Sequence, residues 1–173
     1  MEKGVSKMNE MRMVPIGKIV KRGEESRVEL EGRYAVGLTG LEGYSHVLVL
    51  WWADRCDNAA WRATLVERKP YRNGPAAVGV FACRSPARPN PIAVSVAEIV
   101  WLDAGKGAVG LDFIDAADGT PVVDLKPYAP SVDRAATART PAWCAHWPKS
   151  REESGAFDWA AEFAFAEADD GAR

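Results

Sequence analysis

Helical periodicity is almost absent from the first 130 residues, and this feature constrains the fold more than any other. Apolar residues instead occur in short runs or alternate with polar residues, which is typical of β-strands. We therefore expect a mainly β domain, a small antiparallel sheet closed into a β-barrel. The expected strands cover residues 14–20, 27–31, 46–53, 76–83, 92–101, 108–114 and 121–125.

The domain organisation follows from composition along the chain. The chain is long enough for one domain with a hydrophobic core. Residues 1–12 are polar and predict a disordered lead-in, residues 13–132 form the expected barrel domain, and residues 133–173 form a Trp-rich C-terminal tail. A short helix should begin after Ser150, because Ser-Arg-Glu-Glu is a capping-box pattern. Its apolar side would consist of Phe157, Ala160, Ala161 and Ala164.

Charge and cysteine content limit the functional class. The chain has 22 basic and 24 acidic residues, so a nucleic-acid contact would have to depend on a local basic patch. The mixed charges of residues 62–72 either form such a patch with the nearby arginines or form a solvated loop. Three cysteines without paired spacing predict reduced thiols and a cytoplasmic protein. We expect no membrane helix, which needs about 20 apolar residues, and no metal site.

Residues 81–95 carry the strongest chemical signal. They contain three prolines, which fix φ and remove backbone donors, so this proline loop is stiff and non-helical. A stiff loop holds Arg84, Arg88 and Asn90 in fixed directions, which suits an anionic or hydrogen-bonding ligand. The loop therefore predicts a binding site.

Other candidate motifs have simpler interpretations. The string Gly-x-Gly-x-x-Gly at residues 105–110 leads into an apolar strand, which favours a hairpin turn over a dinucleotide site. His46, His146 and Cys83 lack the partners that a metal site or a nucleophile needs, which favours packed structural roles. The two tail tryptophans, Trp143 and Trp147, favour a packing flap or a dimer contact.

Two motifs are specific enough to indicate a family. Residues 84–92 (Arg-Ser-Pro-Ala-Arg-Pro-Asn-Pro-Ile) and residues 118–128 (Asp-Gly-Thr-Pro-Val-Val-Asp-Leu-Lys-Pro-Tyr) resemble the TrmO/TsaA-like family, as do residues 40–46 and 80–82. The resemblance covers residues 14–132. It implies a homodimeric methyltransferase with a small β-barrel that uses S-adenosylmethionine. It also implies methylation of the exocyclic amine of threonylcarbamoyl-adenosine beside the tRNA anticodon.

The chain also departs from the family pattern. The connection at residues 21–26 lacks an Arg-Gln-Pro-Gly-like element, Asp54-Arg55 replaces the usual His-Gln, and Ala93 replaces a usual glycine. Three functions therefore stay open. They are a tRNA methyltransferase, a methyltransferase of a small molecule or another acceptor, and a non-catalytic S-adenosylmethionine-binding module.

The resemblance and the chemistry of the cofactor together predict the site. The cofactor's carboxylate suits Arg84 or Arg55. Its ammonium group or ribose hydroxyls suit Asp54 and Asp115. The backbone of residues 114–117 would meet the adenine. The full cofactor set is Asp54, Arg55, Arg84, Ser85, Arg88, Asn90, Val94, Ile114, Asp115, Ala116 and Ala117. The expected catalytic set has Asp118 and Asp124 as proton acceptors. It also has Lys126 and Tyr128, which would position the methyl acceptor.

Overall fold

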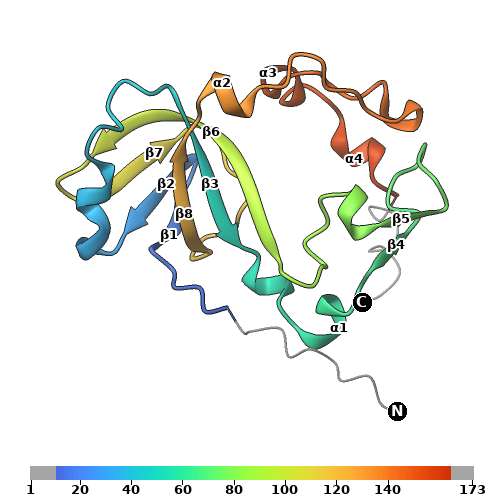
Figure 1. The fold of residues 1–173 in the computed structure, drawn as a ribbon, viewed down its shortest axis with the longest axis horizontal. Helices are drawn as coiled ribbons and strands as arrows, with labels where there is room; N and C mark the ends of the chain where they lie inside the picture. The colour runs from blue at the N-terminus through green and yellow to red at the C-terminus, as the bar shows by residue number, and fades with distance from the viewer. Residues whose placement is uncertain (1–10, 165–173) are drawn as a thin grey trace, which may run out of the picture.

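A closed β-barrel forms the body of the protein in the computed structural model, which describes residues 11–164. Its strands are hydrogen-bonded in the order β1-β2-β7-β6-β3-β8, and each pair is antiparallel. The barrel occupies the left of Figure 1. The expected small antiparallel barrel is therefore confirmed. The six strands are β1 (Gly17–Arg22), β2 (Glu25–Leu30), β3 (His46–Trp52), β6 (Ile92–Asp103), β7 (Ala108–Leu111) and β8 (Pro121–Pro127).

Strands β1 and β7 differ most in extent from the prediction. Strand β1 begins at Gly17 rather than at residue 14, since Pro15 has no amide hydrogen for a ladder and Val14 is exposed. Strand β7 ends at Leu111, because the next residue, Asp112, uses its side chain to accept the Glu98 amide at 2.8 Å. The Gly-rich string before β7 is a hairpin turn from β6, as predicted.

The barrel interior is filled by branched aliphatic side chains. Val47 and Val49 alternate with half-buried neighbours along β3, and both are completely buried. Ile114, after β7, is also completely buried, so the chain remains attached to the core beyond the end of the strand. The sequence shows a continuous apolar run over this strand, whereas buried and half-buried residues alternate along it, as strand geometry requires. A seven-residue 3-10 segment, η1 (Gly32–Leu38), adds Leu38 to the same core.

A smaller hairpin lobe projects from the barrel between β3 and β6, at the right of Figure 1. The strand expected at residues 76–83 is wrong in extent, since only three of these residues pair, and they pair outside the barrel. The chain then turns, because Arg88 binds the carbonyl oxygens of Val80 and Cys83. The lobe consists of η2 (Asp54–Cys56), α1 (Ala59–Arg62), β4 (Val66–Arg68), β5 (Ala77–Gly79) and η3 (Val80–Ala82).

The tail passes over the barrel and reaches the hairpin lobe (Figure 1). Its elements are α2 (Pro130–Asp133), η4 (Ala142–Cys144), α3 (Arg151–Ser154) and α4 (Trp159–Glu162). Ser150 caps α3 as predicted, by accepting the amide of Glu153. The expected single helix is two short helices, because Asp158 caps a second start. Ala160 and Ala161 are therefore exposed.

An aromatic cluster attaches the tail to the hairpin lobe. Tyr71 stacks on Trp143 with ring centroids 5.2 Å apart and meets the edge of Trp147 at 5.0 Å. Glu162 is only 4% exposed, and its carboxylate accepts hydrogen bonds of 2.9 Å from Trp147 Nε1 and of 2.9 Å from His146 Nε2. The predicted packing role of the tail tryptophans and of His146 is confirmed.

Candidate active site

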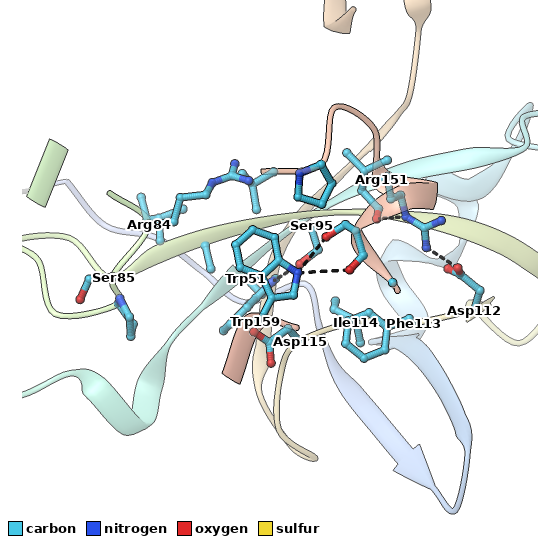
Figure 2. Close-up of a pocket in the computed structure, with 18 of the residues that line it drawn as sticks. Trp51, Arg84, Ser85, Ser95, Asp112, Phe113, Ile114, Asp115, Arg151 and Trp159 are labelled. Atoms are coloured by element: carbon cyan, nitrogen blue, oxygen red, sulfur yellow. Dashed lines mark hydrogen bonds and ion pairs between the residues drawn. The ribbon is translucent and has the colours of Figure 1, made fainter. Parts of the chain in front are cut away.

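A cavity of about 1090 Å³ lies between the barrel, the proline loop and the tail. It is slightly larger than the usual range for small-molecule sites, about 300–1,000 Å³, so it has room for a cofactor and a second group. Arg84 and Ser85 lie at one end and Asp112 and Arg151 at the other (Figure 2). Apart from Trp51, the lining residues come from residues 84–96, 112–115 and 148–159.

The proline loop is organised around Arg88. The guanidinium donates hydrogen bonds to the carbonyl oxygens of Ser85 at 2.7 Å, Val80 at 2.5 Å and Cys83 at 2.8 Å. Three carbonyl groups that the turns leave without strand partners are thereby satisfied. Arg88 lines the cavity, and its Nε and Nη2 donors serve the loop. It therefore shapes the site.

The hairpin lobe holds the loop from outside. Arg62 Nη1 donates to the carbonyl of Pro89 at 3.3 Å, and the same guanidinium is paired with Asp57. Trp52 Nε1 donates to Asp57 Oδ2 at 2.9 Å. The hydrogen bonds from Arg62 and Trp52 lower the pKa of Asp57. Arg62 is thus committed to the scaffold, which weakens the alternative of a phosphate-binding patch in this segment.

Arg84 differs from Arg88 because its side chain is not used by the loop. Arg84 is exposed and lines the cavity. Within residues 11–164 no ion pair involves its guanidinium. The arginine is thus available to bind an anion.

One wall of the cavity combines strand β6 with the segment that follows β7. Val94 is 38% exposed and faces the cavity, and Trp51 Nε1 beside it donates to Ser95 Oγ at 3.0 Å. Ile114 also lines the cavity, but its carbonyl oxygen already accepts a hydrogen bond of 2.8 Å from Lys21 Nζ. Asp115 is exposed at the same wall. Apolar surface and a carboxylate therefore lie side by side.

The tail supplies two charged residues that the sequence did not indicate, Arg151 and Glu152. Arg151 forms an ion pair with Asp112 and donates to the Val96 carbonyl at 2.9 Å. Burial acts to raise the pKa of Asp112, but the hydrogen bonds from Arg151 and the backbone outweigh it and lower that pKa. The pKa of Glu152 is lowered by its own amide and by the Ser150 hydroxyl. The capping-box pattern predicted a helix start here, and no pattern placed it at the cavity.

The cavity brings together part of the predicted site. The predicted residues that line it are Arg84, Ser85, Arg88, Val94, Ile114 and Asp115. The predicted cofactor residues that do not line it are Asp54, Arg55, Asn90, Ala116 and Ala117, of which the first three are exposed and Ala116 is buried. Lining residues missed from the sequence include Trp51, Asp112, Phe113, Arg151, Glu152 and Trp159.

The four predicted catalytic residues all lie outside the cavity. Asp118 Oδ1 accepts the amide of Lys21 at 2.9 Å. Asp124 and Lys126 form an ion pair of 2.8 Å on β8. Tyr128 lies next to His46, with ring centroids 6.2 Å apart. They are therefore spread over both ends of β8 rather than gathered at one point.

Other site types leave no trace in the described part of the chain. Residues 11–164 contain no group of three or more His, Cys, Asp or Glu side chains that could hold a metal ion. None of the helices described there is long and apolar enough to cross a membrane. The three cysteines are free thiols, and burial raises the pKa of Cys56.

Comparison with known proteins connects this cavity to a family. Residues 5–134 match the model of the tRNA-methyltransferase O N-terminal domain. The chain is 36% identical over 108 residues to an S-adenosyl-L-methionine-binding protein of Archaeoglobus fulgidus, covering 62% of this chain and 72% of that protein. It is 43% identical over 98 residues to the tRNA (adenine(37)-N6)-methyltransferase of Escherichia coli, covering 56% of this chain and 41% of the relative.

A solved structure shows the same relationship. The crystal structure of TrmO from Pseudomonas aeruginosa is similar with a TM-score of 0.58 and 29% sequence identity. The match covers 76% of this chain and 62% of that chain, so the present chain spans less than two thirds of it. The proline loop lines the cavity, and this loop lies wholly within the segment that matches the family model.

Proposed function

The chain belongs to the tRNA-methyltransferase O N-terminal domain family, and from this membership we propose that it is an S-adenosylmethionine-dependent methyltransferase. We further propose that its acceptor is the exocyclic amine of threonylcarbamoyl-adenosine beside the tRNA anticodon. The two sequence relatives, an S-adenosyl-L-methionine-binding protein and a tRNA (adenine(37)-N6)-methyltransferase, support the cofactor and the tRNA acceptor. The cavity supplies the physical basis.

The observation that carries the proposal is the meeting of three kinds of group in one cavity. An available arginine and exposed aliphatic surface come from residues 84–96, and an exposed carboxylate comes from residues 112–115. In this proposal Arg84 holds the cofactor carboxylate as a charge-assisted pair. Asp115 holds its ribose hydroxyls or its ammonium group, and Val94 packs on its base. When bound, the cofactor supplies a methyl group activated by a positively charged sulfur.

The chain's own contribution is mainly alignment. Methyl transfer is an in-line displacement, and correct alignment of two groups is worth up to about 7–11 kcal/mol. The hydrogen bonds from Arg88 and Arg62 hold the proline loop in one conformation before a ligand arrives. Arg84 is therefore presented in a fixed direction.

The acceptor amine loses a proton when it gains the methyl group, and a nearby carboxylate can accept it. Three carboxylates line the cavity. Asp112 is engaged with Arg151, and Asp115 is assigned to the cofactor. Glu152 is therefore the proton acceptor in this proposal. Its lowered pKa keeps it ionised at neutral pH.

A labelled-methyl assay tests the activity. The purified chain receives S-adenosylmethionine labelled on the methyl group, together with bulk tRNA and a small-molecule extract in parallel reactions. We expect label in the tRNA fraction, on an adenosine derivative after nuclease digestion. A cofactor that binds but loses its methyl group to neither fraction would favour a non-catalytic binding module.

A second candidate is transfer to a small molecule, and the charge of the cavity favours it. Three basic and three acidic side chains line the cavity, so it has no net cationic charge to attract a polyanion. The basic residues are Arg84, Arg88 and Arg151, and the acidic ones are Asp112, Asp115 and Glu152. Label that is found only in the small-molecule fraction would establish this alternative.

We also propose that the chain acts as a cytoplasmic homodimer. Large apolar side chains are exposed on the hairpin lobe, where Leu65 is 60%, Val66 is 55% and Phe81 is 86% exposed. Exposed apolar surface is typical of a protein interface when it gathers on one part of a molecule. Light scattering on the purified chain should give twice the monomer mass, and a monomer that transfers methyl groups at full rate would contradict the dimer.

A further inference from the structure

One side of the cavity is formed by residues 148–159, which we call the tail wall. The tail wall lies beyond the segment that matches the family, which ends at residue 134. It nevertheless supplies a large share of the lining. These lining residues are Pro148, Ser150, Arg151, Glu152, Ser154, Gly155 and Trp159.

The tail wall is attached to the barrel through Arg151. Its Nε donates to the Val96 carbonyl of strand β6 at 2.9 Å, and its Nη2 pairs with Asp112 (Figure 2). Both side chains of the pair are 29% exposed, so water screens it less than a surface pair. The backbone amide of Glu98 donates a hydrogen bond of 2.8 Å to Asp112 Oδ1. Arg151 therefore determines where the tail wall meets the barrel.

The other end of the tail wall is attached to the hairpin lobe through Trp159. Its ring meets the edge of Trp147 at 5.4 Å and stacks on Phe163 at 5.8 Å. Phe163 in turn forms a β-bridge with Tyr71 of the lobe. Trp159 Nε1 donates to the Ser154 hydroxyl at 3.1 Å, which closes the tail wall on itself. The tail wall thus spans the cavity between two fixed points.

The two sides of the cavity have different origins. The groups assigned to the methyl donor, Arg84, Val94 and Asp115, all lie in the segment that matches the family. The proposed function assigns the donor to that segment, and it assigns the proton-accepting Glu152 to the tail wall. A wall outside the family segment that faces the same cavity is therefore placed to contact the acceptor.

We propose that the tail wall holds the methyl acceptor and that Arg151 is the positioning residue that keeps this wall aligned with the donor. The inference rests on the proposed function. Since transfer depends on the alignment of the two groups, a displaced tail wall should weaken acceptor binding. Donor binding should persist, because its contacts lie on the other segments.

The test compares Asp112→Asn and Arg151→Ala with the wild-type chain. Asp112→Asn removes the ion pair at almost constant volume and keeps an oxygen for the Glu98 amide. We expect the KM for the methyl acceptor, in whichever fraction takes the label, to rise about tenfold in both variants. A tenfold change is typical of the loss of one charge-assisted hydrogen bond. The donor Kd from calorimetry should stay within about twofold of the wild-type value.

Two further variants serve as controls. Arg151→Lys retains the positive charge and should recover part of the acceptor KM. Asp103→Asn removes the ion pair of 2.8 Å with Lys106 in the turn between β6 and β7, outside the lining residues, and should leave KM and Kd unchanged. Melting temperatures identify a variant that fails to fold, and in that event Asp112→Asn alone carries the test.

Three results would overturn the inference. An acceptor KM that stays at the wild-type value in folded Asp112→Asn would exclude a role for the pair. A donor Kd that weakens by the same factor as the acceptor KM would show that the tail wall serves the cofactor. Both results leave the proposed function intact. A wild-type chain that methylates neither fraction would overturn the proposed function and this inference together.

Discussion

The hydroxyl of Ser85 donates a hydrogen bond of 2.6 Å to Glu67 Oε1, joining the proline loop to strand β4 across 18 positions of sequence. Ser85 Oγ also accepts a hydrogen bond of 3.2 Å from the backbone amide of Ala87. Ser85 thus both shapes the loop internally and attaches it to the hairpin lobe. The loop also carries Arg84, so this attachment affects the direction in which the arginine enters the cavity.

Ser85→Ala should weaken donor binding about fivefold and lower the free energy of unfolding by about 1 kcal/mol. The physical reason is that Glu67 loses its donor and the loop loses an attachment. Calorimetry and urea denaturation measure the two quantities. Thr39→Ala is the matched control, because its hydroxyl also makes one hydrogen bond, of 2.8 Å to Val36, outside the cavity. Donor binding equal to wild type would remove Ser85 from the site.

Arg84→Ala should reduce the donor affinity by about tenfold or more, since one half of a charge-assisted pair is lost. The melting temperature should not change, because the side chain is exposed and the loop does not use it. Arg33→Ala is the control, since that arginine pairs with Glu31, lies over the Tyr34 ring and does not line the cavity. If calorimetry gives the same donor Kd for Arg84→Ala and wild type, the cofactor carboxylate binds elsewhere.

Glu152→Gln should lower kcat by about a hundredfold while the donor Kd is retained, because a proton acceptor contributes about 10²–10⁴-fold. Single-turnover methyl transfer measures the rate without product release. Asp118→Asn is measured in parallel, since the sequence pointed to Asp118 for this step. A slow Asp118→Asn beside an unimpaired Glu152→Gln would return the role to Asp118.

Attachment of the tail should weaken in acid. Burial alone would raise the pKa of Glu162, but hydrogen bonds from His146 and Trp147 outweigh it and lower the pKa below its ordinary value of 4.5. A carboxyl with a lowered folded-state pKa stabilises the fold above its unfolded pKa. This stability is lost as the pH falls through the folded value.

Denaturation of the wild-type chain between about pH 7 and pH 3 should show this loss. Glu162→Gln should have a smaller pH dependence over the same range. The control is Glu31→Gln, on the exposed pair with Arg33, which should follow the wild-type profile. Identical profiles for wild type and Glu162→Gln would show that another carboxyl controls the acid response.

The barrel could be predicted because its information is local. The alternation at residues 27–31, and the capping box at Ser150, depend on neighbours within a few residues. The hairpin lobe was less predictable. Residues 76–83 have the composition of a strand, but pairing partners decide strand length, and the Arg88 hydrogen bonds to Val80 and Cys83 end it early.

The sequence by itself determined the barrel class, the stiff proline loop and the candidate residues Arg84 and Asp115. It determined these because proline restricts its own backbone and side-chain alternation follows from strand geometry. Only the tertiary structure decided that the tail crosses the cavity and brings Arg151 to Asp112, 39 positions earlier. It also separated Asp118 and Asp124 from that cavity. Such relationships depend on long-range packing, which no local pattern encodes.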